Sequence, residues 1–333
     1  MLLTGATGFV GRETARELVA AGAEVHAFVR AGSERASLAN HVRTWHVGDL
    51  SDARSIDAAV LALRHRANAL SLPARIVHSA ALISYRTRDG ELARELNVEG
   101  TRRFLAAALR NRIDRFLFVS SVVTVGHSPD GSVLDESAPF HSAELGVDYV
   151  TTKRAAEDLV LAHARELDVV VVNPGAIFGP VDRESNTVRF LQQMARGRGP
   201  RLAPPGHLSV VGVADVARGI VAALAVGRRG ERYLLVESSS SALELFQRIA
   251  RELSVPPVRH SVPRAIWSAL VMAATAWDRV FPMKLATPQA LKMLGVKLRF
   301  DARKARRELA FEPEPFDRVL RDTIAHLRAT DAL

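Results

Sequence analysis

The sequence of 333 residues predicts an α/β fold, a doubly wound parallel sheet flanked by helices, followed by a smaller and mostly helical C-terminal region. Short β-branched runs alternate with segments of helical apolar spacing over residues 1–180, as in repeated βαβ units. Three glycines lie in the turn between the first strand and the first helix. The composition, 48% hydrophobic and 24% charged, excludes a disordered or fibrous chain.

The order of the elements follows from these patterns. We expect strands at 1–4, 24–30, 43–47, 75–79, 115–120 and 169–173, and helices at 12–21, 53–63, 93–111 and 149–166. Gly22 ends the first helix, where a left-handed residue is expected. Beyond Pro180 the alternation weakens. The second region begins there, with a strand at 209–213, a helix at 215–225, a strand at 232–236 and a helix-rich C-terminus.

The net charge of +9 lies in one part of the chain. Residues 1–180 carry 20 Lys and Arg against 21 Asp and Glu, whereas residues 251–307 carry 12 against 3. Residues 284–307 show no zinc-finger spacing, RNA-binding motif or interleaved aromatic residues, so we expect no nucleic-acid partner. The absence of cysteine excludes disulfides, thiolate metal sites and thiol nucleophiles, and we predict no metal site.

The N-terminus carries no apolar stretch before Thr4 and Gly5, so we expect no signal peptide and a cytoplasmic protein. The longest strongly apolar stretch, 265–277, has 13 residues, whereas a membrane-spanning helix needs about 20. This stretch is too short to span a bilayer by itself.

Gly5, Gly8 and Gly11 form a GxxGxxG turn, which allows the backbone to approach a pyrophosphate at a helix N-terminus. An NAD site carries an acidic residue at the end of the second strand, but Arg30 occupies that position. Because a guanidinium suits a phosphate monoester, we predict NADP as the cofactor, with NAD as the alternative. Residues 1–180 then form a dinucleotide-binding domain, which can recruit 209–236, and residues 181–333 form a substrate-binding region.

A Ser, Tyr, Lys set follows the glycine turn along the chain. Ser121 ends the fifth strand, and Tyr149 and Lys153 share one face of a helix because they are four residues apart. An adjacent ammonium favours the phenolate, so Lys153 is expected to lower the pKa of Tyr149 toward the working range of an acid/base. A hydroxyl at Ser121 can stabilise developing charge on a substrate oxygen.

Several motifs together resemble the extended short-chain dehydrogenase/reductase superfamily, which includes the NAD-dependent epimerase/dehydratase family. They are TGATGFVG at 4–11, GDL at 48–50, HSAA at 78–81, NVEGT at 97–101, FVSS at 118–121, YVTTK at 149–153 and NPGAIFGP at 173–180. The resemblance continues through 209–224 and 300–315, so it covers nearly the whole chain. It implies a Rossmann fold, and a homodimer formed through the helices at 93–111 and 149–166.

The resemblance also implies roles for individual residues. Tyr149 would be the acid/base, Lys153 its ribose-binding partner and Ser121 the group that polarises the carbonyl. The implied cofactor-binding residues are Gly5, Thr7, Gly8, Phe9, Val10, Gly11, Arg30, Asp49, Leu50, Ser79, Ala80, Ala81, Asn97, Tyr149, Lys153 and Pro174. Asp49 and Leu50 would contact the adenine and Pro174 would lie beside the nicotinamide. Alternatively, Asp49 is a helix cap, Asn97 a polar helix residue and Pro174 a strand end.

Enzymes of this kind either reduce or oxidise a carbinol on an apolar substrate, like dihydroflavonol reductases and 3β-hydroxysteroid dehydrogenases, or epimerise nucleotide sugars. Arg30 favours an exchangeable NADP, and therefore net hydride transfer to or from a ketone or secondary alcohol of an apolar, including cyclic, substrate. A nucleotide-sugar epimerase or dehydratase with tightly held NAD is the alternative. A non-catalytic NADP sensor is a second alternative, disfavoured because such proteins typically lose the Tyr and Lys.

Residues 265–281 are apolar almost all round a helix, with Ile266, Leu270, Ala273, Trp277 and Val280 along one side. Arg264, Arg279 and Lys284 flank this segment. One interpretation is a peripheral membrane contact through 264–307, drawn by anionic lipid. We favour the other, a helix buried under the substrate cleft or in a dimer contact.

Overall fold

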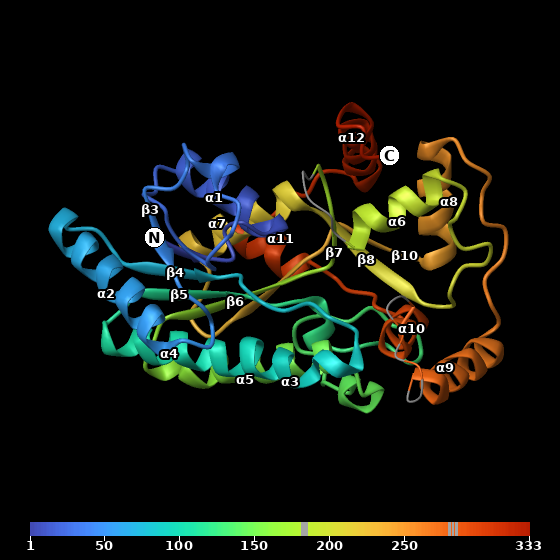
Figure 1. Cartoon of the computed structure of the whole chain (residues 1–333). Coiled ribbons are helices and arrows are strands. Elements are labelled where there is room, and N and C mark those ends of the chain that lie inside the picture. The colour runs from blue at the N-terminus through green and yellow to red at the C-terminus, as the bar shows by residue number, and fades with distance from the viewer. Residues whose placement is uncertain (181–185, 279–280, 282, 284–285) are drawn as a thin grey trace.

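The computed structural model describes residues 1–180, 186–278, 281, 283 and 286–333. Its central feature is a seven-stranded sheet (Figure 1). Its strand order is β3-β2-β1-β4-β5-β6-β9, and all neighbours run parallel. The strands are β1 (Leu2–Thr4), β2 (His26–Val29), β3 (Thr44–Val47), β4 (Arg75–His78), β5 (Arg115–Val119), β6 (Val169–Pro174) and β9 (Arg232–Leu235). The predicted α/β doubly wound fold class is confirmed.

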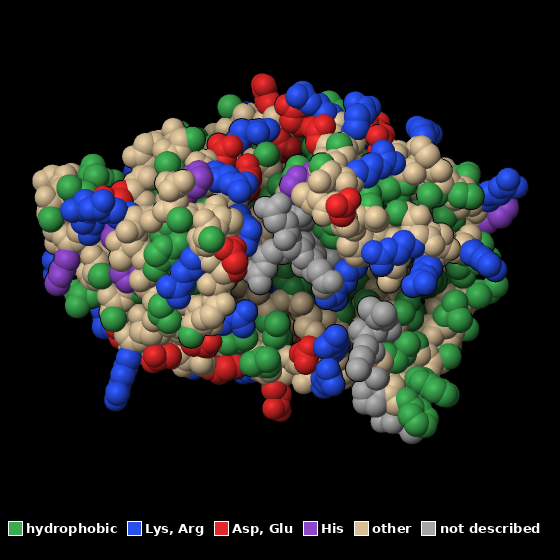
Figure 2. All heavy atoms as spheres, turned by 45° about the horizontal axis from the view of Figure 1, so that its top comes forward, with side chains coloured by type: hydrophobic (Ala, Val, Ile, Leu, Met, Phe, Trp, Pro, Cys, Tyr) green, Lys and Arg blue, Asp and Glu red, His purple; other side chains and the backbone are tan. Residues whose placement is uncertain are grey.

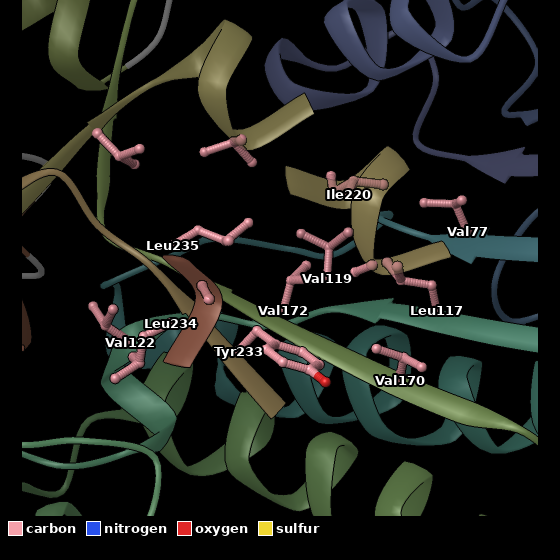
Figure 3. Close-up of a cluster of buried hydrophobic side chains, with 14 of the residues drawn as sticks. Val77, Leu117, Val119, Val122, Val170, Val172, Ile220, Tyr233, Leu234 and Leu235 are labelled. Carbon is pink, nitrogen blue, oxygen red and sulfur yellow. The ribbon is translucent and has the colours of Figure 1, made fainter. Parts of the chain in front are cut away.

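Helices cover both faces of this sheet (Figure 1). One face carries α1 (Phe9–Ala20), α7 (Val213–Val226) and α11 (Arg303–Leu309), and the other carries α2 (Ala53–Leu70), α4 (Gly100–Arg110) and α5 (Asp148–Ala162). Because both faces are covered, the strands are apolar on both sides, as parallel strands usually are. In β5, Phe116 packs into the core on the α4 side, and Leu117 packs with Ile220 of α7 on the other (Figure 3).

The strand order reverses between β1 and β4, which is where doubly wound sheets bind ligands at the carboxyl ends of their strands. The helix expected at 93–111 is divided at this edge. It consists of α3 (Gly90–Ala93), a π-helical turn η3 (Arg94–Glu99) and α4. Such turns inside helices often accompany functional sites.

A second sheet, of order β10-β8-β7, and its helices form the smaller region. Its elements are β7 (Ala176–Phe178), α6 (Asn186–Ala195), β8 (His207–Gly212), β10 (Ser238–Ser241), α8 (Ala242–Leu253), α9 (Arg264–Asp278), α10 (Pro288–Gly295) and α12 (Phe316–Ala329). A separate apolar core joins α6, α8 and α12 to β7 and β8. Of the strands expected at 209–213 and 232–236, the first is β8 in this second sheet, and the second is β9 beside β6.

The remaining elements are short 3₁₀ turns: η1 (Ala36–Leu38), η2 (Thr87–Asp89), η4 (Val122–Thr124), η5 (Ser142–Leu145) and η6 (His163–Arg165). Within the part of the chain that the structure describes, no helix has the length and apolar character needed to cross a membrane.

Replacing Phe116 by alanine should test the packing under β5. Its side chain is fully buried, so the Phe116→Ala variant should lose about 3–5 kcal/mol of unfolding free energy. Leu61→Ala on the exposed side of α2 is the matched control and should change stability by less than about 0.5 kcal/mol. Urea unfolding measures both, and equal midpoints for the two variants would contradict the described core.

Candidate active site

The glycine turn is packed too closely to accept side chains. Gly5 has a φ of +69°, and a Cβ added there would lie 2.9 Å from the backbone nitrogen of Ala80. A Cβ on Gly11 would lie 2.0 Å from the carbonyl oxygen of Gly5. Gly8 precedes α1 without a side-chain cap, so the first N–H groups of the helix remain available to an anion. This cradle fits the pyrophosphate of a dinucleotide.

A buried chain of hydrogen bonds fixes this turn to the neighbouring strand. The Thr4 hydroxyl accepts from the N–H groups of Ser79 (3.1 Å) and Ala80 (3.0 Å), so its proton is directed at Nδ1 of His78 (2.9 Å). Nε2 of His78 then carries the ring proton and donates to Thr101 at 3.1 Å. Thr101 in turn donates to the carbonyl of Asn97 at 2.6 Å. We assign the tautomer from this network.

Burial, with a smaller contribution from the charge of Lys153, lowers the pKa of His78 to about 3. His78 therefore stays neutral near physiological pH and serves as a structural link, which excludes it as an acid/base there.

Asn97 lies in the π-helical turn and holds the segment that follows β4. Its Oδ1 accepts from the N–H of Leu82 at 2.7 Å, and its Nδ2 donates to the carbonyl of Leu82 at 3.0 Å. The same Nδ2 donates to the hydroxyl of Thr152 on α5 at 3.2 Å. Ser79, Ala80 and Ala81, all half-buried, lie in the segment that Asn97 holds against α5.

The expected adenine-side residues follow β2 and β3. Arg30 is exposed directly after β2. Asp49 accepts from the hydroxyl (2.6 Å) and the N–H (2.9 Å) of Ser51, and these bonds, with a smaller contribution from Arg30, lower its pKa. Leu50 is half-buried and contacts α4 at Gly100, where an added Cβ would lie 3.0 Å from the Leu50 side chain. The charge of Arg30 therefore acts on Asp49 at the same edge of the sheet.

The remaining residues expected to bind the cofactor lie in the glycine turn and at the end of β6. Thr7 is buried, and Phe9 and Val10 are half-buried at the start of α1. Pro174 is buried in β6, where it pairs with Leu235 of β9.

Ser121 and Tyr149 meet at the end of β5. Burial raises the pKa of Tyr149, and the nearby Ser121 hydroxyl opposes this shift with a smaller effect. Lys153, one helical turn along α5, donates from Nζ to the carbonyl of Val119 at 2.8 Å and lies 4.2 Å from the ring centre of Phe118. The direction of the Tyr149 shift is thus opposite to the sequence expectation, because burial outweighs the neighbouring groups.

Burial, partly opposed by the carboxylate of Glu157, lowers the pKa of Lys153 to about 7. Glu157, fully buried one turn further along α5, accepts from Asn173 (2.8 Å) and Thr124 (2.6 Å). Its other oxygen lies 3.3 Å from Arg232 of β9. Sequence analysis did not select Glu157, although its spacing of four residues from Lys153 is the signal that could have indicated it.

Tyr85 is a second residue that sequence analysis did not select. Its ring contacts that of Tyr149 edge to face, with centres 5.7 Å apart. Burial raises the pKa of Tyr85, and Tyr149 raises it further. The sequence places Tyr85 in a loop with no motif around it, so only the fold brings the two phenols together.

No group of three or more His, Asp or Glu side chains within the described ranges is arranged to hold a metal ion.

Comparisons with known proteins place this geometry in context. The model of the NAD-dependent epimerase/dehydratase family matches residues 1–235. Sterol demethylase protein B of Methylococcus capsulatus is 33% identical over 98% of both chains. A 4-hydroxy-2-methyl-3-oxo-4-farnesyl-3,4-dihydroquinoline-1-oxide ketoreductase of Stigmatella aurantiaca is 31% identical over 93% of this chain and 90% of its own. The crystal structure of a nucleoside-diphosphate-sugar epimerase from Pseudomonas aeruginosa has a TM-score of 0.80 and 26% identity, covering 100% of this chain and 98% of its own.

The close approach of Gly5 to Ala80 should control dinucleotide binding. Gly5→Ala forces the backbone apart at the cradle, so the affinity for NADP or NAD should fall at least about tenfold. Gly22 has a similar φ of +78° but nothing within 4 Å, so Gly22→Ala should cost about 1 kcal/mol of stability and leave the affinity unchanged. Calorimetric titration and thermal unfolding separate the two effects. Equal affinities in both variants would show that the cradle does not hold the dinucleotide.

Proposed function

The chain belongs to the NAD-dependent epimerase/dehydratase family, whose relatives include NAD(P)-dependent oxidoreductases, and from this premise we propose that it is an NADP-dependent oxidoreductase. The proposed reaction is hydride transfer between the bound nicotinamide and a ketone or secondary alcohol of an apolar substrate. The observation that carries the proposal is the position of the buried Tyr149 phenol beside the Ser121 hydroxyl, with Lys153 one helical turn away on α5.

The residues proposed to hold the cofactor follow the strands from β3 to β6 at the carboxyl edge of the sheet, or lie on η3 and α5. The glycine cradle and the first N–H groups of α1 would bind the pyrophosphate, and Arg30 would bind the ribose 2′-phosphate. The other proposed contacts come from Thr7, Phe9, Val10, Asp49, Leu50, Ser79, Ala80, Ala81, Asn97, Tyr149, Lys153 and Pro174.

Tyr149 would supply the proton for reduction. Its raised pKa keeps the phenol protonated at neutral pH, which is the form that can donate to a substrate oxygen as that oxygen becomes an alkoxide. The Ser121 hydroxyl would hydrogen-bond the same oxygen and stabilise its charge. The phenolate left on Tyr149 would be stabilised by the ammonium of Lys153, whose charge Glu157 helps to retain.

The apolar character of the proposed substrate is supported by the relatives. One is named for a sterol pathway and another for reduction of a farnesyl-substituted quinoline oxide, and both cover nearly the whole chain. Bulky, mostly hydrocarbon ketones are therefore the first compounds to test.

A panel of ketones, including cyclic and isoprenoid compounds, tests the reaction class through oxidation of NADPH. We expect turnover with apolar ketones. The structural similarity to a nucleoside-diphosphate-sugar epimerase supports the second candidate, an epimerase or dehydratase with tightly held NAD. If no ketone in the panel supported NADPH oxidation and the protein interconverted UDP-sugars, the epimerase or dehydratase would become the favoured function.

Removing the Tyr149 hydroxyl should abolish most of the activity. Tyr149→Phe should lower kcat/KM about 10²–10⁴-fold, mainly through kcat, because the proton donor is lost while the glycine cradle and Arg30 still hold NADPH. Tyr233→Phe is the matched control, since its hydroxyl bonds Glu308 and the N–H of Arg228 instead. Activity should survive in this control. If Tyr149→Phe left the function in the native host intact, a non-catalytic NADP sensor would be the better account.

Arg30 should determine the preference for NADPH. Losing a charge-assisted contact to the 2′-phosphate should weaken NADPH binding about 10–100-fold in Arg30→Ala and leave NADH binding unchanged. Arg54→Ala, exposed at the start of α2, removes the same charge as a control. Comparing kcat/KM for the two cofactors checks this, and a native preference for NADH would refute the NADP assignment.

A further inference from the structure

Helix α9 exposes an apolar face to solvent. No residue of this 15-residue helix is buried, and no charged residue lies between Arg264 and Asp278. Ile266, Leu270 and Trp277 are 55%, 49% and 60% exposed. Hydrophobic side chains gather at the end of the molecule where α9 lies (Figures 1 and 2). Soluble proteins seldom leave so continuous an apolar face uncovered without a function.

The opposite face of α9 is attached to the protein. Trp267, Val271 and Ala274 are half-buried on this side. Nε1 of Trp267 donates to the carbonyl of Leu291 in α10 at 3.1 Å, and a Cβ on Gly295 would lie 2.6 Å from that nitrogen. The helix is thus fixed in one orientation. The side predicted from sequence to carry Ile266, Leu270, Ala273 and Trp277 is the exposed one, and Val280 lies outside the described residues.

This arrangement corrects one of the sequence-based alternatives. The helix is not buried under the substrate cleft, because none of its residues is buried and Ile266, Leu270 and Trp277 face solvent while its other side packs on α10.

Cations lie at both ends of α9. Arg264 begins the helix, and Arg259 is exposed five residues earlier. At the other end, the Thr87 hydroxyl donates to Asp278 at 3.1 Å and brings Arg86 and Arg88 alongside. Among the described residues, Arg86, Arg259 and Arg264 have no carboxylate within 4 Å, and Arg88 lies 3.8 Å from Asp89.

Three of the basic residues further along the chain are paired with carboxylates. Arg303, Lys304 and Arg307 of α11 form ion pairs with Asp301, Glu231 and Glu308. In the part of this region that the structure describes, Lys292, Lys297, Arg299 and Arg306 form no ion pair, so cations without a carboxylate partner lie both beside α9 and further along the 264–307 segment. Arg279 and Lys284, also expected to flank the helix, lie outside the described residues.

We propose that α9 docks the protein on the surface of an anionic phospholipid bilayer. An apolar helical face between two groups of arginines suits the boundary between acyl chains and anionic headgroups. A second copy of the chain that pairs through parallel α9 helices fits this surface less well, because each group of arginines would then face its own copy.

The docked orientation would bring the candidate active site close to the lipid. The Thr287 hydroxyl at the start of α10 donates to the carbonyl of Tyr85 at 2.6 Å, and Gln289 donates to Asp148, at the start of α5, at 2.6 Å. Helix α10 therefore connects α9 to both Tyr85 and the helix that carries Tyr149. The docking proposal does not depend on the reaction, so a vesicle experiment tests it alone.

Cosedimentation of the full chain with vesicles tests the proposal. Binding to phosphatidylcholine vesicles containing phosphatidylglycerol should exceed binding to pure phosphatidylcholine, and should fall as salt is raised. Leu270→Glu, on the exposed face, should weaken binding about tenfold or more. Leu61→Glu adds the same charge at a 45% exposed leucine of α2 and should bind like the native chain. Circular dichroism verifies that both variants fold.

Two further measurements distinguish a lipid bilayer from a second copy of the chain as the partner of α9. The fluorescence of Trp277 should shift to shorter wavelength with anionic vesicles, and this shift should disappear in Trp277→Phe. Equal binding of native and Leu270→Glu chains would overturn the proposal. So would a native dimer in sedimentation equilibrium that Leu270→Glu dissociates and that binds no vesicles, because a second copy would then cover α9.

Discussion

The buried hydroxyl of Thr4 is the contact on which the geometry of the candidate site depends. It accepts from the N–H groups of Ser79 and Ala80 and donates to His78, so it joins the ends of β1 and β4 where the strand order reverses. Leaving such buried polar groups without partners would cost about 1–3 kcal/mol each. The glycine cradle begins at the next residue, and the segment toward Tyr85 begins at the same point on β4.

Helix α5 carries the ionisable groups of the site in a row. Tyr149, Lys153 and Glu157 are buried one turn apart, and burial favours the neutral form of the first two. Glu157 counters this for Lys153, and is itself held by Asn173 and faced by Arg232. Arg232 belongs to β9, which pairs with β6 in the large sheet but comes after β7, α6 and β8 of the smaller region along the chain. The charges around Lys153 therefore depend on a strand that is distant from it in sequence.

The sheet domain and the end of the molecule at α9 differ in how far their charged and apolar side chains are covered. In the sheet domain, apolar residues are covered on both faces, and Arg303, Lys304 and Arg307 of α11 are paired with carboxylates. At α9 an apolar face and unpaired arginines are both exposed. The excess of basic residues over 251–307 thus includes both the paired cations of α11 and the unpaired Arg259 and Arg264 beside α9.

The sequence by itself determined the fold class, the order of the strands along the chain and the positions of the glycine turn and of Ser121, Tyr149 and Lys153. These features depend on local spacing, which the chain carries in its residue order. Only the tertiary structure decided that Tyr85 meets Tyr149, that burial raises the pKa of Tyr149, and that the apolar face of α9 points outward. Each of these depends on contacts between residues distant in sequence, or on which side of a helix finds a partner, and no local pattern specifies either.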